Sequence, residues 1–218
     1  MKFKGRYRYN RQTPCVYENL KVVFHGIPKN ASTTIKNALY EAEHGKEFNG
    51  NKQWVHKGNE KGGSIYPSLE EIETNYEDYL HLTVVRDPYT RFRSFYSDLF
   101  LGMTSIRDNI PPFYIDNNIN FLDNDIESVL DIIEYFSDDD ADEHFASQKS
   151  FLHYHNVHWI EMEHLNEQWS NVCDRLDIAF DPLPVYNKTN NHVMLTDDQK
   201  ERIFNRYKDD FWSFNYAR

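Results

Sequence analysis

The chain has 218 residues, a formal net charge of −11 at pH 7 and a hydrophobic fraction of 39%. This length suits one domain with a sizeable core, and the acidic balance argues against a general nucleic-acid binder, which needs a basic surface. No run approaches the ~18 consecutive apolar residues of a membrane-spanning helix, and the basic N-terminus MKFKGRYRYNRQTP lacks the apolar segment of a signal peptide.

The first half of the chain predicts two strands that alternate with helices. The segment LKVVFHGI (20–27) has the apolar run of a buried strand, and a helical pattern follows from about Ser32 to His44. SLEEIETNY (68–76) opens with a serine cap and predicts a helix, and YLHLTVV (79–85) predicts the next strand. Between them, residues 45–67 form a long glycine-rich stretch, and loops of this length are often functional.

The second half continues the alternation. A helix that starts near Pro88 places its large apolar side chains on one face, namely Phe92, Phe95, Tyr96 and Leu99. VHWIEM (157–162) predicts a third strand, and helices are expected over 163–176 and 196–211. The acidic segment 121–145 is interpreted as a solvated helix face and loop.

Strands alternating with helices predict an α/β fold, a central parallel sheet flanked by helices. Such sheets bind ligands where the strands end and the helices begin. We expect one domain over residues 1–218, with its core over about 20–216. Two cysteines, Cys15 and Cys173, make no disulfide framework, so a reducing, cytoplasmic location is the simpler expectation.

A short polar loop, Pro28-Lys29-Asn30-Ala31-Ser32-Thr33-Thr34, leaves the first strand and leads directly into a helix. Backbone N–H groups at a helix start have no partner within the helix, and the helix dipole there favours an anion. Lysine and hydroxyl side chains on the same turn would add donors. The loop therefore predicts a phosphate site; the alternative is an ordinary turn capped by Ser32 or Thr33.

The second strand also ends in a candidate phosphate ligand, Arg86, and Ser94 follows about two helical turns after Pro88. An arginine fork and a serine hydroxyl suit a second phosphate group. In the alternative interpretation, Arg86 pairs with Asp87 and Ser94 faces a neighbouring helix. Because the carboxyl ends of parallel strands share one edge, the first loop favours the phosphate interpretation.

These motifs resemble those of sulfotransferases that use 3′-phosphoadenosine 5′-phosphosulfate (PAPS). IPKNASTTIKNAL (27–39) looks like their loop for the 5′-phosphosulfate, and RDPYTRFRSFY (86–96) like their 3′-phosphate segment, with Arg and Ser eight residues apart. The carbohydrate branch, including chondroitin 4-O and heparan or uronyl 2-O enzymes, is the most similar. DEHFASQKSFL (142–152), WIEMEHLNEQWSNVCDRLDI (159–178) and YKDDFWSFNY (207–216) look like further motifs of that branch, so the resemblance runs from Lys21 to Tyr216.

The resemblance implies a P-loop-like three-layer sandwich and in-line transfer of a sulfuryl group from PAPS to a hydroxyl, favouring a carbohydrate acceptor and no metal. The implied cofactor ligands are Pro28, Lys29, Asn30, Ala31, Ser32, Thr33, Thr34, Arg86, Ser94 and, more weakly, Lys188. Lys29 would also stabilise the leaving group. We choose His56, in the long loop, as the base, with Glu43 and His44 as contenders, because histidine readily accepts a proton near neutral pH.

The sequence departs from this family at two places. Asn30-Ala31 stands where members often carry Thr or Ala followed by Gly, so a positive φ at Ala31 would be mildly strained. The Golgi members have a membrane anchor and lumenal disulfides, which we do not find, so a compact cytoplasmic relative is expected.

Two other classes of function stay open. A P-loop kinase or NTPase would place lysine directly before the Ser/Thr that holds Mg²⁺, within a loop that has two glycines; here Lys29 precedes the hydroxyl cluster and neither glycine is present. A non-catalytic nucleotide-binding protein is the other alternative. His153, His155 and His158 have metal-like spacing but no clear fourth ligand, so a structural or surface role is expected.

Overall fold

The computed structural model describes residues 14–48, 67–101, 112–119, 125–152, 156–184 and 193–218. Its strands are β1 (Cys15–Tyr17), β2 (Val22–His25), β3 (Leu80–Val85) and β4 (His158–Glu161). Its helices are α1 (Ser32–His44), α2 (Leu69–Asn75), α3 (Pro88–Leu99), α4 (Pro112–Asp116), α5 (Ile126–Tyr135), η4 (Lys149–Phe151), η5 (Met162–His164), α6 (Leu165–Leu176) and α7 (Asp197–Ser213). Within these ranges no helix is long and apolar enough to span a membrane.

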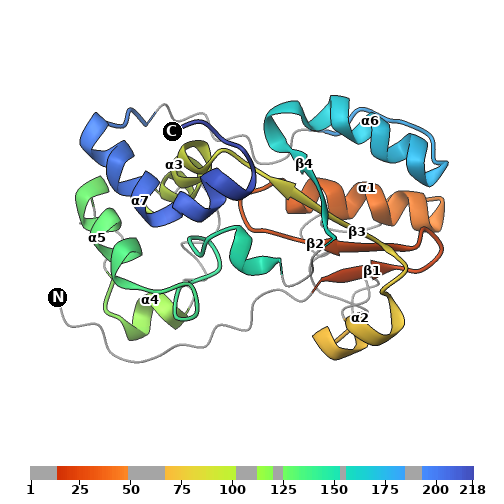
Figure 1. The fold of residues 1–218 in the computed structure, drawn as a ribbon, viewed down its shortest axis with the longest axis horizontal. Coiled ribbons are helices and arrows are strands. Elements are labelled where there is room, and N and C mark those ends of the chain that lie inside the picture. Colours follow the sequence, from red (N-terminus) through yellow and green to blue (C-terminus); the bar gives the residue numbers. More distant parts are fainter. Residues whose placement is uncertain (1–13, 49–66, 102–111, 120–124, 153–155, 185–192) are drawn as a thin grey trace. The chain divides into compact units, whose positions relative to one another are not determined.

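The chain folds into two compact units. Of the described residues, the sheet unit contains 14–48, 67–86, 151–152 and 156–184, and the helical unit contains 87–101, 112–119, 125–150 and 193–218. All four strands lie in the sheet unit, with α1, α2 and α6, whereas α3, α4, α5 and α7 lie in the helical unit (Figure 1).

The sheet has the strand order β1-β2-β3-β4, in which β2, β3 and β4 run parallel and β1 pairs antiparallel with β2. In register, Phe24 lies opposite Leu82, and Leu82 lies opposite His158. The parallel core was predicted from the alternation of strands and helices. The edge strand β1 was not, because three residues give too short a pattern to distinguish a strand from a loop.

Helices cover both faces of this sheet (Figure 1). On one face, Phe24 and Leu82 pack with α1 and α6, whose Leu39 and Trp169 are buried in the same cluster. On the other face, Val23 packs with Ile72 of α2, among other residues. Successive strand residues thus point to opposite faces, as the pleat requires, and the result is the predicted α/β sandwich of three layers.

The helical unit has an aromatic core. Ring contacts link side chains from α3, α4, α7 and the segments that follow α3 and α5, among them Phe92, Phe95, Tyr96, Phe100, Phe113, Tyr114, Phe136, Phe145 and Phe211. The four residues predicted for the apolar face of α3 are all buried. The predicted helix starts are also confirmed, because Ser68 and Thr196 each form a capping box.

The acidic segment was only partly understood from the sequence. Helix α5 does expose acids, and three of them pair with Arg202 of α7, namely Glu127, Asp131 and Glu134. Its apolar side is buried, however, and Asp142 beyond it is fully buried. The interpretation of residues 121–145 as solvated was therefore wrong for Asp142, whose carboxylate accepts hydrogen bonds instead of facing water.

Candidate functional site: the β2–α1 loop and the end of β3

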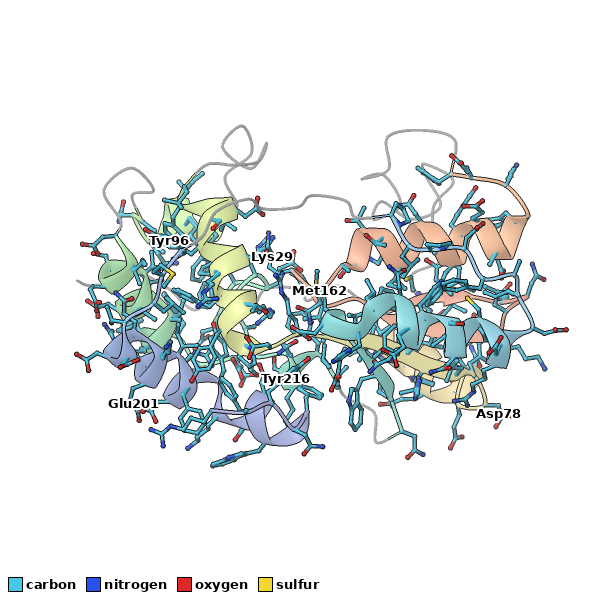
Figure 2. The ribbon with its side chains drawn as sticks, turned by 90° about the horizontal axis from the view of Figure 1, so that it is seen from above. Lys29, Asp78, Tyr96, Met162, Glu201 and Tyr216 are labelled. Carbon is cyan, nitrogen blue, oxygen red and sulfur yellow. The ribbon has the colours of Figure 1, made fainter. Side chains whose placement is uncertain are left out.

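The loop between β2 and α1 lies at the carboxyl edge of the sheet. Figure 2 shows Lys29, which follows β2, and Met162, which follows β4, at the same end of the sheet unit, with Asp78, which precedes β3, at the opposite end. This is the edge at which parallel α/β sheets bind their ligands.

Two residues of this loop adopt a left-handed conformation. Lys29 has φ 71°, and Ala31, the residue that precedes α1, has φ 54° and ψ 24°. A left-handed residue followed by helical residues turns successive N–H groups toward one side of the chain, which is the geometry of an anion-binding nest. The positive φ at Ala31, a residue with a Cβ, is therefore mildly strained.

The start of α1 supplies further N–H groups to this nest. The hydrogen bond from the Ile35 N–H to the Ala31 carbonyl closes the first helical turn at 3.1 Å, so the N–H groups of Ser32, Thr33 and Thr34 precede it. No side chain caps this end of α1. The alternative of a turn capped by Ser32 or Thr33 is therefore wrong. The Ser32 hydroxyl instead donates to the Ile27 carbonyl at 2.5 Å, which leaves Ser32 its N–H as the donor for an anion.

Contacts with the neighbouring strand hold the loop in this shape. The Asn30 amide donates to the Val84 carbonyl of β3 at 2.8 Å, and Asn30 is buried. The Arg86 guanidinium, from the end of β3, donates to the Lys29 carbonyl at 3.0 Å. Lys29 and Arg86 were predicted to bind two different phosphates. They are joined here by the hydrogen bond from the Arg86 side chain to the Lys29 carbonyl, at the carboxyl edge of the sheet.

The geometry of a cationic, left-handed loop at the carboxyl edge of a parallel sheet matches what the comparison with known proteins finds. A family model described as the sulfotransferase family matches residues 15–217. The chain belongs to the sulfotransferase family. No curated protein and no solved structure matches it. Membership supports sulfuryl transfer in general and does not favour the kinase alternative, whose loop would also carry two glycines.

The structure gives few or no contacts for the other predicted cofactor ligands of this sulfotransferase. Ser94 lies on α3 in the helical unit and is buried. Asp87, considered as a partner of Arg86, caps α3 by accepting from the Thr90 N–H at 2.8 Å. Lys188 and His56 lie outside the described residues and remain predictions.

The contenders for the catalytic base have other roles or positions. Glu43 accepts from the N–H groups of Asn19 and Leu20, at 3.0 and 3.1 Å, and so holds the β1–β2 turn. It also lies eleven residues along α1 from Ser32, a rise of about 16 Å. His44, one residue further, is exposed, and its ring contacts that of Tyr40 in a tilted arrangement. Glu43 and His44 thus lie far along α1 from the loop, which argues against either side chain as the base for a ligand bound there.

Two buried histidines support the strands under the loop. His81 contacts the Tyr76 carbonyl through Nε2 at 3.1 Å, and its Nδ1 lies 2.9 Å from Nε2 of His25. Since a carbonyl only accepts, Nε2 of His81 carries the hydrogen and its Nδ1 accepts from His25. Burial lowers the pKa of His81 below 6.5, which favours the neutral form of its imidazole.

Sequence reasoning missed one cation near the loop. Lys36, on α1, is 1% exposed and follows Ser32 by four residues, which places both on one helix face. Buried lysines are rare and need compensating charge or hydrogen bonds. Its position beside the buried apolar residues Ile35, Leu39 and Tyr40 of α1 was the signal that could have identified it.

Proposed function

We propose that this chain transfers a sulfuryl group from PAPS to an acceptor hydroxyl, and that the acceptor is a carbohydrate. The observation that carries the proposal is the left-handed conformation of Lys29 and Ala31 ahead of α1, where the N–H groups of Ser32, Thr33 and Thr34 precede the first hydrogen bond of the helix. Such a loop suits a 5′-phosphate with a sulfate attached, because it combines converging N–H donors with a lysine. The carbohydrate acceptor rests on the resemblance of the motifs alone.

The residues present fit this donor. PAPS would supply the activated sulfuryl group, with adenosine 3′,5′-bisphosphate as the leaving group. The N–H groups of Ser32, Thr33 and Thr34 would bind the 5′-phosphate, and Lys29 would stabilise the negative charge that builds on it during transfer. Donors that are held in place before the reaction need no reorganisation during it. The hydrogen bond from Asn30 to β3 holds the loop in this way.

We assign the 3′-phosphate to Arg86 and Ser94, with Lys188 as a weaker candidate. Since Arg86 also donates to the Lys29 carbonyl, its removal affects the loop as well as the ligand. Ser94→Ala is therefore the cleaner variant, and Arg86→Lys keeps the charge while losing the fork.

Calorimetric titration with the bisphosphate and with 5′-AMP tests this assignment. We expect Ser94→Ala and Arg86→Ala to weaken bisphosphate binding, the latter by tenfold or more, since a charged hydrogen bond contributes about 1.5–3 kcal/mol. Binding of 5′-AMP should change little in Ser94→Ala. Equal losses for both ligands in both variants would assign Arg86 and Ser94 to the loop and not to the 3′-phosphate.

The function itself is tested by incubating the protein with ³⁵S-labelled PAPS and separate acceptors: desulfated chondroitin, desulfated heparan, a simple sugar, a phenol, a steroid and an amine. We expect label on a carbohydrate, and its loss in Lys29→Ala. Label on the phenol alone would overturn the carbohydrate acceptor and keep the donor. No transfer to any acceptor, together with no bisphosphate binding, would favour a non-catalytic protein.

A further inference from the structure

The edge strand β4 carries an exposed aromatic ring and a carboxylate on one face. Trp159 is 42% exposed, and no other large hydrophobic side chain on the described strands is exposed to this extent. Glu161 follows two residues later and is partly buried. Ile160, between them, is buried in the cluster with α1 and α6, so Trp159 and Glu161 point to the opposite face. Along the strand, the Cα atoms of this β4 pair lie about 6.6 Å apart, a span that one sugar ring can bridge.

Helix α6 orients the Glu161 side chain. The Glu161 N–H donates to Oε1 of Gln168 at 2.6 Å, and Nε2 of Gln168 donates to Oε2 of Glu161 at 3.4 Å. Oε1 of Glu161 has no hydrogen-bond partner within the part of the chain that the structure describes. This oxygen can therefore accept from a hydroxyl group, and the bond would be charge-assisted.

The β4 pair lies close to the loop that we assign to the donor. In register, Glu161 lies opposite Val85, the last residue of β3, which Arg86 follows. Met162, the residue after Glu161, lies at the same end of the sheet unit as Lys29 (Figure 2). Neighbouring strands are about 4.8 Å apart and β4 is two strands from β2, so the ends of β4 and β2 are separated by about 10 Å.

The segment that contains the β4 pair is acidic. Residues 156–184 hold six carboxylate side chains and one permanent cation, Arg175. Glu161 and Glu163 both lie at the carboxyl end of β4. Burial, and to a smaller extent Arg175, lowers the pKa of His158, which favours its neutral form. Because like charges across an interface repel, this segment suits an uncharged ligand better than a polyanion.

We propose that the acceptor is an uncharged sugar that binds along β4, with one face of its ring on Trp159 and a hydroxyl donating to Oε1 of Glu161. This inference rests on the proposed function and narrows the acceptor to carbohydrates without carboxylates. The C–H groups on one face of a sugar ring are attracted to the negative face of an indole ring. Trp159 and Glu161 bind the acceptor, and neither transfers a proton.

Transfer from ³⁵S-labelled PAPS tests the class of acceptor. The uncharged sugars lactose, cellobiose and diacetylchitobiose are compared with two polyuronates, desulfated chondroitin and desulfated heparan. We expect the highest kcat/KM for one of the uncharged sugars. Glu161→Lys should shift the preference toward the polyuronates, because it replaces a repelling charge by an attracting one. A higher kcat/KM for a polyuronate in the wild type, or no transfer to any uncharged sugar, would overturn the inference.

Steady-state kinetics with the preferred uncharged sugar test the β4 pair. Trp159→Ala should raise KM for the sugar by about five- to tenfold, and Glu161→Gln by about tenfold. KM for PAPS and the affinity for the bisphosphate should stay at their wild-type values. Trp159→Leu keeps an apolar side chain without the aromatic ring, so it should raise KM for the sugar as Trp159→Ala does, and it replaces that variant if the latter unfolds.

Two matched controls come from the same unit. Phe180 is also 42% exposed, and Glu167 is an exposed acid on α6. Phe180→Ala and Glu167→Gln should leave KM for the sugar unchanged. An increase in the controls as large as in the β4 variants would overturn the inference, because it would show no specific role for the pair.

The remaining outcomes separate this inference from the proposed function. Unchanged KM for the sugar in Trp159→Ala and Glu161→Gln overturns the inference, while transfer by these variants upholds the proposed function. Label on a phenol alone also overturns the inference and keeps PAPS as the donor. A wild-type protein that neither binds the bisphosphate nor transfers label contradicts the proposed function itself.

Discussion

Replacing Ala31 by glycine should stabilise the protein, which is the opposite of what glycine does at most positions near a helix. Ala31 has φ 54° and ψ 24°, a left-handed conformation that costs an L-residue with a Cβ roughly 1–2 kcal/mol. Glycine removes that strain, but it loses more chain entropy on folding, by about 0.5–1 kcal/mol. The balance is a gain of about 0.5–1 kcal/mol, or a rise in Tm of about 1–4 °C for a chain of this size.

A matched control comes from the same helix. Ala38 lies inside α1 and packs on its core, so Ala38→Gly should cost about 1 kcal/mol or more and lower Tm by about 2–4 °C. Both variants are compared with the wild type by calorimetry and by guanidinium denaturation followed by circular dichroism. Equal destabilisation by the two substitutions would refute the left-handed conformation of Ala31 and, with it, the nest at the start of α1.

Other predictions concern the groups around the loop and in the helical unit. Glu43→Ala should lower the free energy of unfolding by about 1–2 kcal/mol, because two backbone N–H groups lose their acceptor, while calorimetric bisphosphate affinity stays unchanged. Burial lowers the pKa of His81, so its stabilising contribution is present above pH 6.5 and is lost as pH falls through the folded-state value. The free energy of unfolding should therefore fall less in His81→Gln than in the wild type between pH 6.5 and 5. The two slopes should differ by up to about 1.4 kcal/mol per pH unit. Burial alone raises the pKa of Asp138, but Arg206 and the donors of Ser147 outweigh it and hold the pKa below 3.8. Asp138→Asn should lower Tm at pH 7, and the difference should shrink as pH falls below 3.8; the exposed Asp139→Asn should show neither effect.

Patterns repeated over many residues made most of the fold predictable. Helix α1 was expected from Ser32 to His44 and is found there, and the capping residues Ser68 and Thr196 were identified before their helices. Strands β2, β3 and β4 were recognised from apolar runs. Periodicity and capping are local properties, so the sequence alone carries them.

Features set by contacts between distant residues could not be predicted in this way. Asn30 reaches Val84, and Arg86 reaches the carbonyl of Lys29, only because the sheet places β3 beside β2. The burial of Asp142 in an acidic segment has the same origin, since its partner Tyr114 is 28 residues away. The acidic composition suggested a solvated segment, whereas the fold supplies Asp142 with hydrogen-bond donors. These donors offset the free-energy cost of burying its carboxylate.

The phosphate motifs could be predicted only in part. The order and spacing of the first loop, Arg86 and Ser94 indicated the family, and the match over residues 15–217 supports it. Which donors face a ligand depends on the loop's conformation. The Ser32 hydroxyl, predicted as a phosphate donor, donates to the Ile27 carbonyl, while the left-handed conformation of Ala31 is that of an anion-binding nest.

Binding of adenosine 3′,5′-bisphosphate, compared with ATP and Mg²⁺ by isothermal titration, tests the central claim most directly. The proposed function predicts saturable binding of the bisphosphate without added metal, weakened in Lys29→Ala, and much weaker binding of ATP whether or not Mg²⁺ is present. Stabilisation of the protein by the bisphosphate should accompany this binding in thermal unfolding. Mg²⁺-dependent binding of ATP as tight as that of the bisphosphate would contradict the account and restore the phosphoryl-transfer alternative.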